Sequence, residues 1–133
     1  MELIREIDDG VKINSAKMCT QYLEEFRNQD REMFIVLGLD SKNKPVYREI
    51  NSIGTLNSSL VHPREVFKKA IMMSCNAIIV AHNHPSDEPE PSNEDKLVTE
   101  NLKQAGEILG IPLLDHIIIS KNTEYSFKEY GEL

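Results

Sequence analysis

The feature that most constrains the fold of this chain is a short run at residues 77–81, with the sequence Ala-Ile-Ile-Val-Ala. The run is too short for a typical helix, is rich in β-branched residues and is apolar at every position. It therefore predicts a strand that is covered on both faces. Such a strand lies inside a sheet with helices above and below it. The run thus predicts an α/β architecture.

The rest of the chain alternates between helical and extended patterns, with a turn expected at residues 40–45. The expected helices run from Asn14 or Ser15 to about residue 28, from residue 62 or 63 to 74, and from residue 92 to about 110. The other expected strands cover about residues 34–39, 46–53, 111–120 and 125–128. Because helices separate most of the strands, we expect a mixed sheet packed by about three helices, in a single domain over residues 1–133.

Several apolar side chains on the first two helices are expected to face the core. On the first helix they are Met18, Tyr22, Leu23 and Phe26, and on the second they are Val66, Phe67, Ala70 and Ile71. Met72 and Met73 follow directly and are expected to fill the core rather than to form a binding surface.

Composition limits the compartment and the partners of the protein. The chain has 22 acidic and 15 basic residues, a formal net charge of −7, and this disfavours adhesion to DNA, RNA or anionic lipid. No apolar run approaches the roughly 18 residues of a membrane span, and residues 1–10 lack the apolar core of a signal peptide. Cys19 and Cys75 cannot build a disulfide framework, so we expect reduced thiols in the cytoplasm. The composition is compatible with a homo-oligomer as well as with a monomer.

Two histidines directly follow the apolar run. His82 and His84 are two residues apart on an extended chain, so both side chains point to one side while Asn83 faces away. Ser92 and Asp95 are three residues apart at the start of a helix and share one of its faces. Two imidazoles and a carboxylate are the ligands of a catalytic zinc, which keeps a fourth position for water. The spacing predicts one Zn²⁺ per chain, whose bound water attacks a carbonyl.

A metal-bound water needs a proton acceptor beside it. Glu32 precedes the first expected strand, and it would reach the histidines if that strand runs beside residues 77–81. Glu49 and Glu65 are rival carboxylates. The residues alone leave the choice among the three open.

The same residues resemble the JAMM signature of the JAB1/MPN metalloprotease superfamily. More narrowly, the chain is similar to the RadC-type branch, historically named DNA repair protein RadC, over about residues 13–127. Beyond Glu32, Ser92 and Asp95, the likeness rests on Gly54-Thr55-Leu56-Asn57-Ser58-Ser59, His62-Pro63-Arg64-Glu65-Val66-Phe67, His82-Asn83-His84-Pro85-Ser86 and Leu114-Asp115-His116-Ile117-Ile118-Ile119. Asp87 stands where the branch usually has Gly, and Asp tolerates a left-handed backbone better than most residues. The N-terminal helix-hairpin-helix-like region of full-length members is missing.

The resemblance implies a curved, cytidine-deaminase-like sheet and hydrolysis of a peptide or isopeptide amide in an unidentified peptide or protein substrate. It assigns the zinc to His82, His84 and Asp95. Glu32 would be the general base that takes a proton from the zinc water. Ser92 would help to hold the oxyanion through its hydroxyl.

For Ser92 and for the pair Asp115 and His116, a structural role is the alternative to a direct role in catalysis or metal binding. Ser92, with an acid three residues later, is also a helix-capping pattern. Asp115 and His116 are expected to support the site structurally, for example by orienting a ligand imidazole, rather than to bind metal.

At the level of function, the alternative to a hydrolase is a non-hydrolytic zinc-binding module linked to DNA repair. The charge and the missing region argue against direct binding of nucleic acid.

Overall fold

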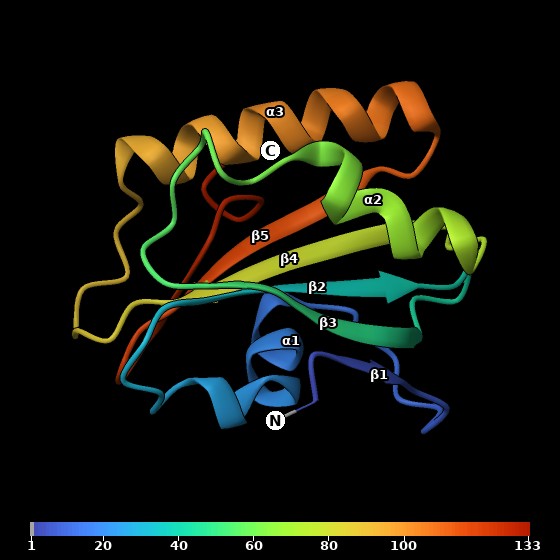
Figure 1. Ribbon diagram of the computed structural model, residues 1–133. Coiled ribbons are helices and arrows are strands. Elements are labelled where there is room, and N and C mark those ends of the chain that lie inside the picture. The colour runs from blue at the N-terminus through green and yellow to red at the C-terminus, as the bar shows by residue number, and fades with distance from the viewer. Residues whose placement is uncertain (1) are drawn as a thin grey trace.

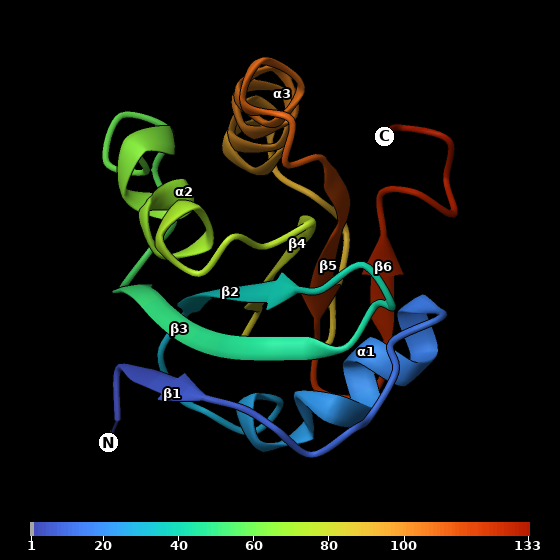
Figure 2. The same ribbon diagram turned by 90° about the vertical axis from the view of Figure 1, so that its right-hand side faces the viewer.

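A six-stranded sheet lies between two layers of helices in the computed structural model, which describes residues 2–133 (Figure 1). The strands are β1 (Ile4–Glu6), β2 (Met33–Leu39), β3 (Pro45–Ile53), β4 (Ala77–Asn83), β5 (Leu113–Ile119) and β6 (Glu124–Ser126). The helices are α1 (Ala16–Tyr22), α2 (Pro63–Met72) and α3 (Asn93–Leu109), with a 3₁₀ turn at Glu24–Phe26. Figure 2 shows α2 and α3 on one face of the sheet and α1 on the other.

The strand order is β1-β3-β2-β4-β5-β6, and only β4 and β5 are parallel neighbours among the described strands. Parallel neighbours need a long crossover connection, and α3 provides it. The crossover brings the end of β4 close to the start of α3. The predicted mixed sheet with three helices is confirmed.

Strand β4 is buried along its whole length, as the apolar run predicted. Ile78 and Val80 pack in the core cluster beneath α2 and α3, whereas Ile79 and Ala81 pack in the cluster against α1. Side chains alternate between the two faces of a strand. His82 therefore lies on the face that α2 and α3 cover.

The first predicted helix is wrong at its C-terminal end. Helix α1 stops at Tyr22, and the separate 3₁₀ turn follows. The Arg27 side chain donates hydrogen bonds to the backbone carbonyls of Ser120 (2.7 Å) and Thr123 (3.2 Å), far along the chain. These contacts hold the 3₁₀ turn and Arg27 against the β5–β6 connection. Met18, which was expected in the core, is 36% exposed.

The edge strand β1 is absent from the sequence-based prediction. Its three residues are exposed, and two of them are charged, so the segment has no apolar pattern to recognise. Its pairing with β3 is antiparallel, with Ile4 opposite Glu49. Backbone hydrogen bonds to a neighbouring strand, rather than burial, define this element.

Two apolar residues near the end of α2 face solvent, contrary to the prediction. Ile71 is 53% exposed and Met72 is 69% exposed, whereas Met73 packs against the core. The buried stripe of α2 is formed by Val66, Phe67 and Ala70. Only one stripe of side chains on α2 faces the sheet. Ile71 follows Ala70 directly, so its side chain lies outside this stripe and points to solvent. Within residues 2–133, no helix is long and apolar enough to cross a membrane.

Candidate metal centre

The three predicted ligands meet where β4 ends and α3 begins. His82 Nε2 lies 3.2 Å from Asp95 Oδ1, and His84 Nε2 lies 3.3 Å from Asp95 Oδ2. The two Nε2 atoms are 2.9 Å apart. The three residues can offer ligand atoms that all lie within 4.8 Å of one another. The β4–α3–β5 crossover therefore assembles the group that the spacing predicted.

The donor set fits a divalent transition metal ion. Imidazole nitrogen is a common ligand of such ions, and two imidazoles with one carboxylate leave a coordination position open. The side chains of His82 and Asp95 are 1% and 2% exposed, whereas that of His84 is 16% exposed. Among the three ligands, His84 faces the solvent, and this is the side from which a substrate can approach.

The local electrostatics keep Asp95 ionised. Burial raises the pKa of Asp95, but the adjacent imidazoles of His82 and His84 outweigh this effect and hold the pKa well below its usual range. For His84, burial lowers the pKa, and the hydrogen bonds to Asp95 and to the Glu88 carbonyl raise it above the ordinary value. The carboxylate is thus already in the charge state in which it binds a cation.

Ser92 and Asp95 also form the N-terminal cap of α3. Ser92 Oγ accepts a hydrogen bond from Asp95 N at 3.1 Å, and Asp95 Oδ2 accepts one from Ser92 N at 2.8 Å. This reciprocal pair is a capping box, which fixes the start of the helix. The cap uses a lone pair of the Ser92 hydroxyl, so the hydroxyl hydrogen stays available as a donor. The capping alternative is thus observed, and it is compatible with the predicted catalytic role.

Glu32 lies directly before β2, on the strand that pairs with β4. Phe34 is opposite His82 in this antiparallel ladder. Because the strands are antiparallel, Glu32, two residues before Phe34, and His84, two residues after His82, continue on the same side of the sheet. Glu32 Oε2 accepts a hydrogen bond from Leu56 N at 3.0 Å, and the Glu32 charge adds to the groups that raise the pKa of His84. Glu32 therefore lies on the same side of the sheet as the two histidines, where its charge acts on His84.

The rival carboxylates lie elsewhere. Burial raises the pKa of Glu49, and the charges that act on it further are those of Glu65 and of Lys69 and Lys68 on α2. Glu65 itself is an exposed residue of the first turn of α2. Of the three candidates that the sequence left open, the geometry favours Glu32.

Asn83 faces away from the two histidines and holds the segment that carries Glu32. Its Oδ1 accepts a hydrogen bond from Met33 N at 2.7 Å, and its Nδ2 donates one to the Arg31 carbonyl at 2.8 Å. Asn83 is fully buried. One amide thus fixes the chain on both sides of Glu32. Sequence reasoning missed this role, because the partners of the amide lie about fifty residues earlier in the chain.

The predicted supporting pair divides between the two faces of β5. His116 is fully buried, and its Nε2 lies 2.9 Å from His82 Nδ1. Its Nδ1 lies 2.6 Å from Thr99 Oγ1. Burial lowers the pKa of His116 well below the ordinary value. Asp115 accepts instead from Ser126 Oγ at 2.6 Å, so it ties β5 to β6. Within the described chain, only His116 of this pair contacts a predicted ligand.

The loop after His84 does not require glycine at Asp87. The non-glycine residues with positive φ in the described part of the chain are Asn43 and Ser74. The Asp87 carboxylate accepts a hydrogen bond from Asn122 Nδ2 at 2.7 Å, which ties the loop to the β5–β6 connection.

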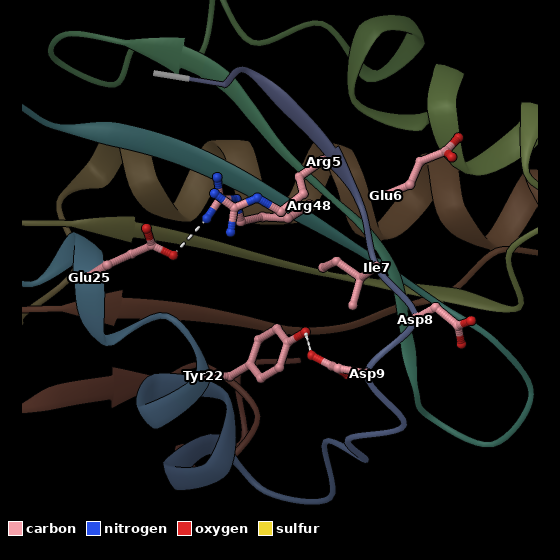
Figure 3. Close-up of a pocket in the computed structure, with 8 residues that line it drawn as sticks. All are labelled: Arg5, Glu6, Ile7, Asp8, Asp9, Tyr22, Glu25 and Arg48. Carbon is pink, nitrogen blue, oxygen red and sulfur yellow. Dashed lines mark hydrogen bonds and ion pairs between the residues drawn. The ribbon is translucent and has the colours of Figure 1, made fainter.

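A separate hollow of about 440 Å³ lies beside β1 on the α1 side of the sheet (Figure 3). Two pairs of its polar side chains are bonded to each other. The Tyr22 hydroxyl donates to Asp9 at 2.6 Å, and Arg48 Nη1 donates to Glu25 at 2.6 Å. Within residues 2–133, none of the predicted metal-binding or catalytic residues lines this hollow.

A model of the RadC-like JAB domain matches residues 13–132 of the chain. The chain is 46% identical over 122 residues to a UPF0758 protein of Thermotoga maritima, covering 92% of this chain and 55% of the relative. It is 53% identical over 114 residues to a UPF0758 protein of Desulforamulus reducens, covering 86% and 50%. It is 48% identical over 136 residues to one from Methanosarcina mazei, covering 98% and 59%. The chain thus spans about half the length of the curated relatives that it matches. The chain belongs to the RadC-like JAB domain family.

Proposed function

We propose that this domain is a zinc-dependent hydrolase that cleaves a peptide or isopeptide amide. The observation that carries the proposal is the convergence of His82, His84 and Asp95, whose ligand atoms lie within 4.8 Å of one another. Glu32 lies on the same side of the sheet, where its charge acts on His84. Membership of the RadC-like JAB domain family supports the same class of chemistry. A zinc ion held by these residues would supply a Lewis acid and lower the pKa of a water molecule.

Glu32 is the proposed general base. Its Oε2 accepts from the Leu56 backbone N–H, and this leaves the other carboxylate oxygen to accept a proton from the attacking water. The same oxygen can then deliver the proton to the amide nitrogen that leaves. The Asn83 amide fixes the backbone on both sides of Glu32, so the base keeps its position during both transfers.

Ser92 is the proposed donor to the developing oxyanion. Its Oγ accepts from Asp95 N, and its hydroxyl hydrogen can point to the carbonyl oxygen of the substrate. Ser92 is exposed at the start of α3, and this gives a substrate access to it. The capping bond fixes the oxygen atom, so the donor needs no rearrangement.

The proposed partner is a peptide or protein in the cytoplasm, and the domain is not proposed to bind nucleic acid directly. The competing function is a non-hydrolytic zinc-binding module linked to DNA repair. Both functions need the metal, and only the hydrolase needs Glu32.

The first experiment measures metal content by elemental analysis after dialysis against zinc. We expect about one zinc per chain in the wild type, because one set of three ligands is present. His82→Ala and Asp95→Ala should lose it. A wild-type protein that retains no zinc would exclude the hydrolase.

The second experiment separates the two functions. Zinc-loaded protein is screened against a peptide library and against lysine-linked isopeptides. Glu32→Gln should keep its zinc and lose about 100-fold or more in rate, since a general base contributes about 10²–10⁴-fold. Glu49→Gln and Glu65→Gln are matched controls and should cleave like the wild type. Zinc-loaded protein that cleaves none of these substrates would favour the non-hydrolytic module.

A further inference from the structure

A chain of hydrogen bonds leads from Asp95 on α3, through β5, to His82 on β4. Thr99 Oγ1 lies 2.8 Å from the Asp95 carbonyl oxygen and 2.6 Å from His116 Nδ1. His116 Nε2 then lies 2.9 Å from His82 Nδ1. The four residues are 3% exposed or less, so water does not compete for these groups. Asp95 thus contributes its carboxylate to the metal site and its backbone carbonyl to this chain.

The chemistry of the groups determines where each hydrogen lies. The Asp95 carbonyl only accepts, so the Thr99 hydroxyl hydrogen points to it. Thr99 Oγ1 must then accept from His116, which places a hydrogen on His116 Nδ1. A neutral imidazole carries one ring hydrogen, so His116 Nε2 accepts and His82 Nδ1 donates. The lone pair of His82 Nε2 is left facing Asp95 and His84.

The surroundings of His116 keep the ring neutral and in place. It stacks on Phe127, with ring centroids 4.8 Å apart and planes 7° from parallel. Phe34 meets the ring edge-on, with centroids 6.0 Å apart. The two ring nitrogens face a hydroxyl and another imidazole. A buried imidazolium without an opposite charge in contact is strongly disfavoured, and the aromatic walls hold the ring in this orientation.

We propose that Thr99 and His116 are positioning residues that hold His82 in the tautomer that a metal ligand needs. The proposal rests on the proposed metal site, although not on hydrolysis. His84 has its own device, since its Nδ1 lies 3.0 Å from the Glu88 carbonyl. Both histidines therefore direct an Nε2 lone pair to the same point. His84 depends on an exposed loop for this, whereas His82 depends on a buried side-chain relay.

The direct test is the ring tautomer in the metal-free protein. Protein labelled with ¹⁵N-histidine is stripped with a chelator, and long-range ¹H–¹⁵N spectra report which ring nitrogen carries the hydrogen. In the wild type we expect hydrogen on Nδ1 of both His82 and His116. Thr99→Val keeps the shape but removes the acceptor for His116 Nδ1. In this variant we expect the hydrogens of both rings to move to Nε2.

The second readout is zinc affinity, measured by competition with a chromophoric chelator. Loss of a residue that orients a metal ligand typically costs about 10–100-fold in affinity, so we expect Thr99→Val to weaken zinc binding by about this factor. Thr99→Ser retains the hydroxyl and is the matched control, with the tautomer and affinity of the wild type. The dispersion of the amide spectrum shows whether each variant is folded.

Two results would overturn the proposal. One is a wild-type His82 that carries its hydrogen on Nε2. The other is a folded Thr99→Val variant with the wild-type tautomer and zinc affinity. A wild-type protein that binds no zinc contradicts the proposed function instead, and the tautomer measurement still decides whether the relay exists. Zinc binding without hydrolysis leaves the relay standing.

Discussion

Asn83 connects β4, which carries His82, to the segment that carries Glu32, so its replacement should destabilise the fold. Asn83→Ala leaves the Met33 amide and the Arg31 carbonyl without their side-chain partner. Because a buried group left unsatisfied costs about 1–3 kcal/mol, we expect the free energy of unfolding to fall by about 2–4 kcal/mol. Urea denaturation measures this change. Asn76→Ala, at an exposed position, is the control and should stay within about 0.5 kcal/mol of the wild type. Equal losses in the two variants would contradict the role of Asn83.

The two thiols should be unreactive in the folded protein. Cys19 lies on α1 and packs in the core cluster on that side of the sheet, whereas Cys75 packs beneath α2 and α3, so the two thiols lie on opposite faces of the sheet. Burial raises the pKa of Cys19 to about 12 and that of Cys75 to about 11. Both stay protonated at pH 8, and the thiolate is the reactive form. A thiol reagent at pH 8 should therefore label two cysteines per chain in denaturant and neither of them rapidly in the native state. Rapid labelling of the native protein would contradict this expectation.

The ligand residues could be predicted because local geometry fixes their relative positions. His82 and His84 follow the two-residue period of a strand, and Asp95 lies in the first turn of the next helix. Thr99 and Asn83 could not be identified in this way. The Asn83 amide contacts a residue fifty positions away, and Thr99 meets His116 only after β5 is in place. Their roles depend on which strands pair, and local patterns do not specify that pairing.

Among the elements, β2 requires a glycine where it crosses the ring of Tyr47. A Cβ atom at Gly38 would overlap that ring and lie 2.8 Å from Cys75 Sγ. Tyr47 is fully buried and cannot move into solvent. We expect Gly38→Ala to lower the free energy of unfolding by about 1–3 kcal/mol, the usual cost of overpacking. Thermal and urea denaturation measure it. Adding Tyr47→Leu to Gly38→Ala removes the ring and should recover part of the lost free energy of unfolding. A double variant that recovers none of it would argue against a clash between the new Cβ atom and the Tyr47 ring.

Element boundaries could be predicted where a local signal marks them. Helix α3 begins after Ser92, whose side chain caps it, and ends at Gly110, which adopts a left-handed φ of 72°. Helix α1 has no such stop signal, and the 3₁₀ turn that follows it ends at Arg27, whose side chain donates to a distant carbonyl. Strand β1 is recognised only through its pairing with β3. The errors therefore fall where tertiary contacts decide the local structure.

For the whole molecule, the net charge affects which macromolecules it can bind. With a formal charge of −7, the domain should repel a polyanion. We expect no binding to single- or double-stranded oligonucleotides at low salt, up to a protein concentration of about 100 μM, the weak end of non-specific DNA affinity. Fluorescence anisotropy measures this. A complex that forms at micromolar concentration and weakens as salt is added would contradict the expectation and favour a role on DNA.

The metal-binding half of the site is local in sequence, whereas Glu32 is not. His82, His84 and Asp95 belong to the continuous unit β4–α3–β5, and Glu32 joins them only when β2 pairs with β4. A chain that has formed the first unit alone can present the metal ligands without the proposed proton acceptor. For the proposed hydrolase, cleavage would then be confined to molecules that have completed folding. A folding intermediate, which exposes its own flexible segments and meets those of other newly made chains, would be unable to cut them.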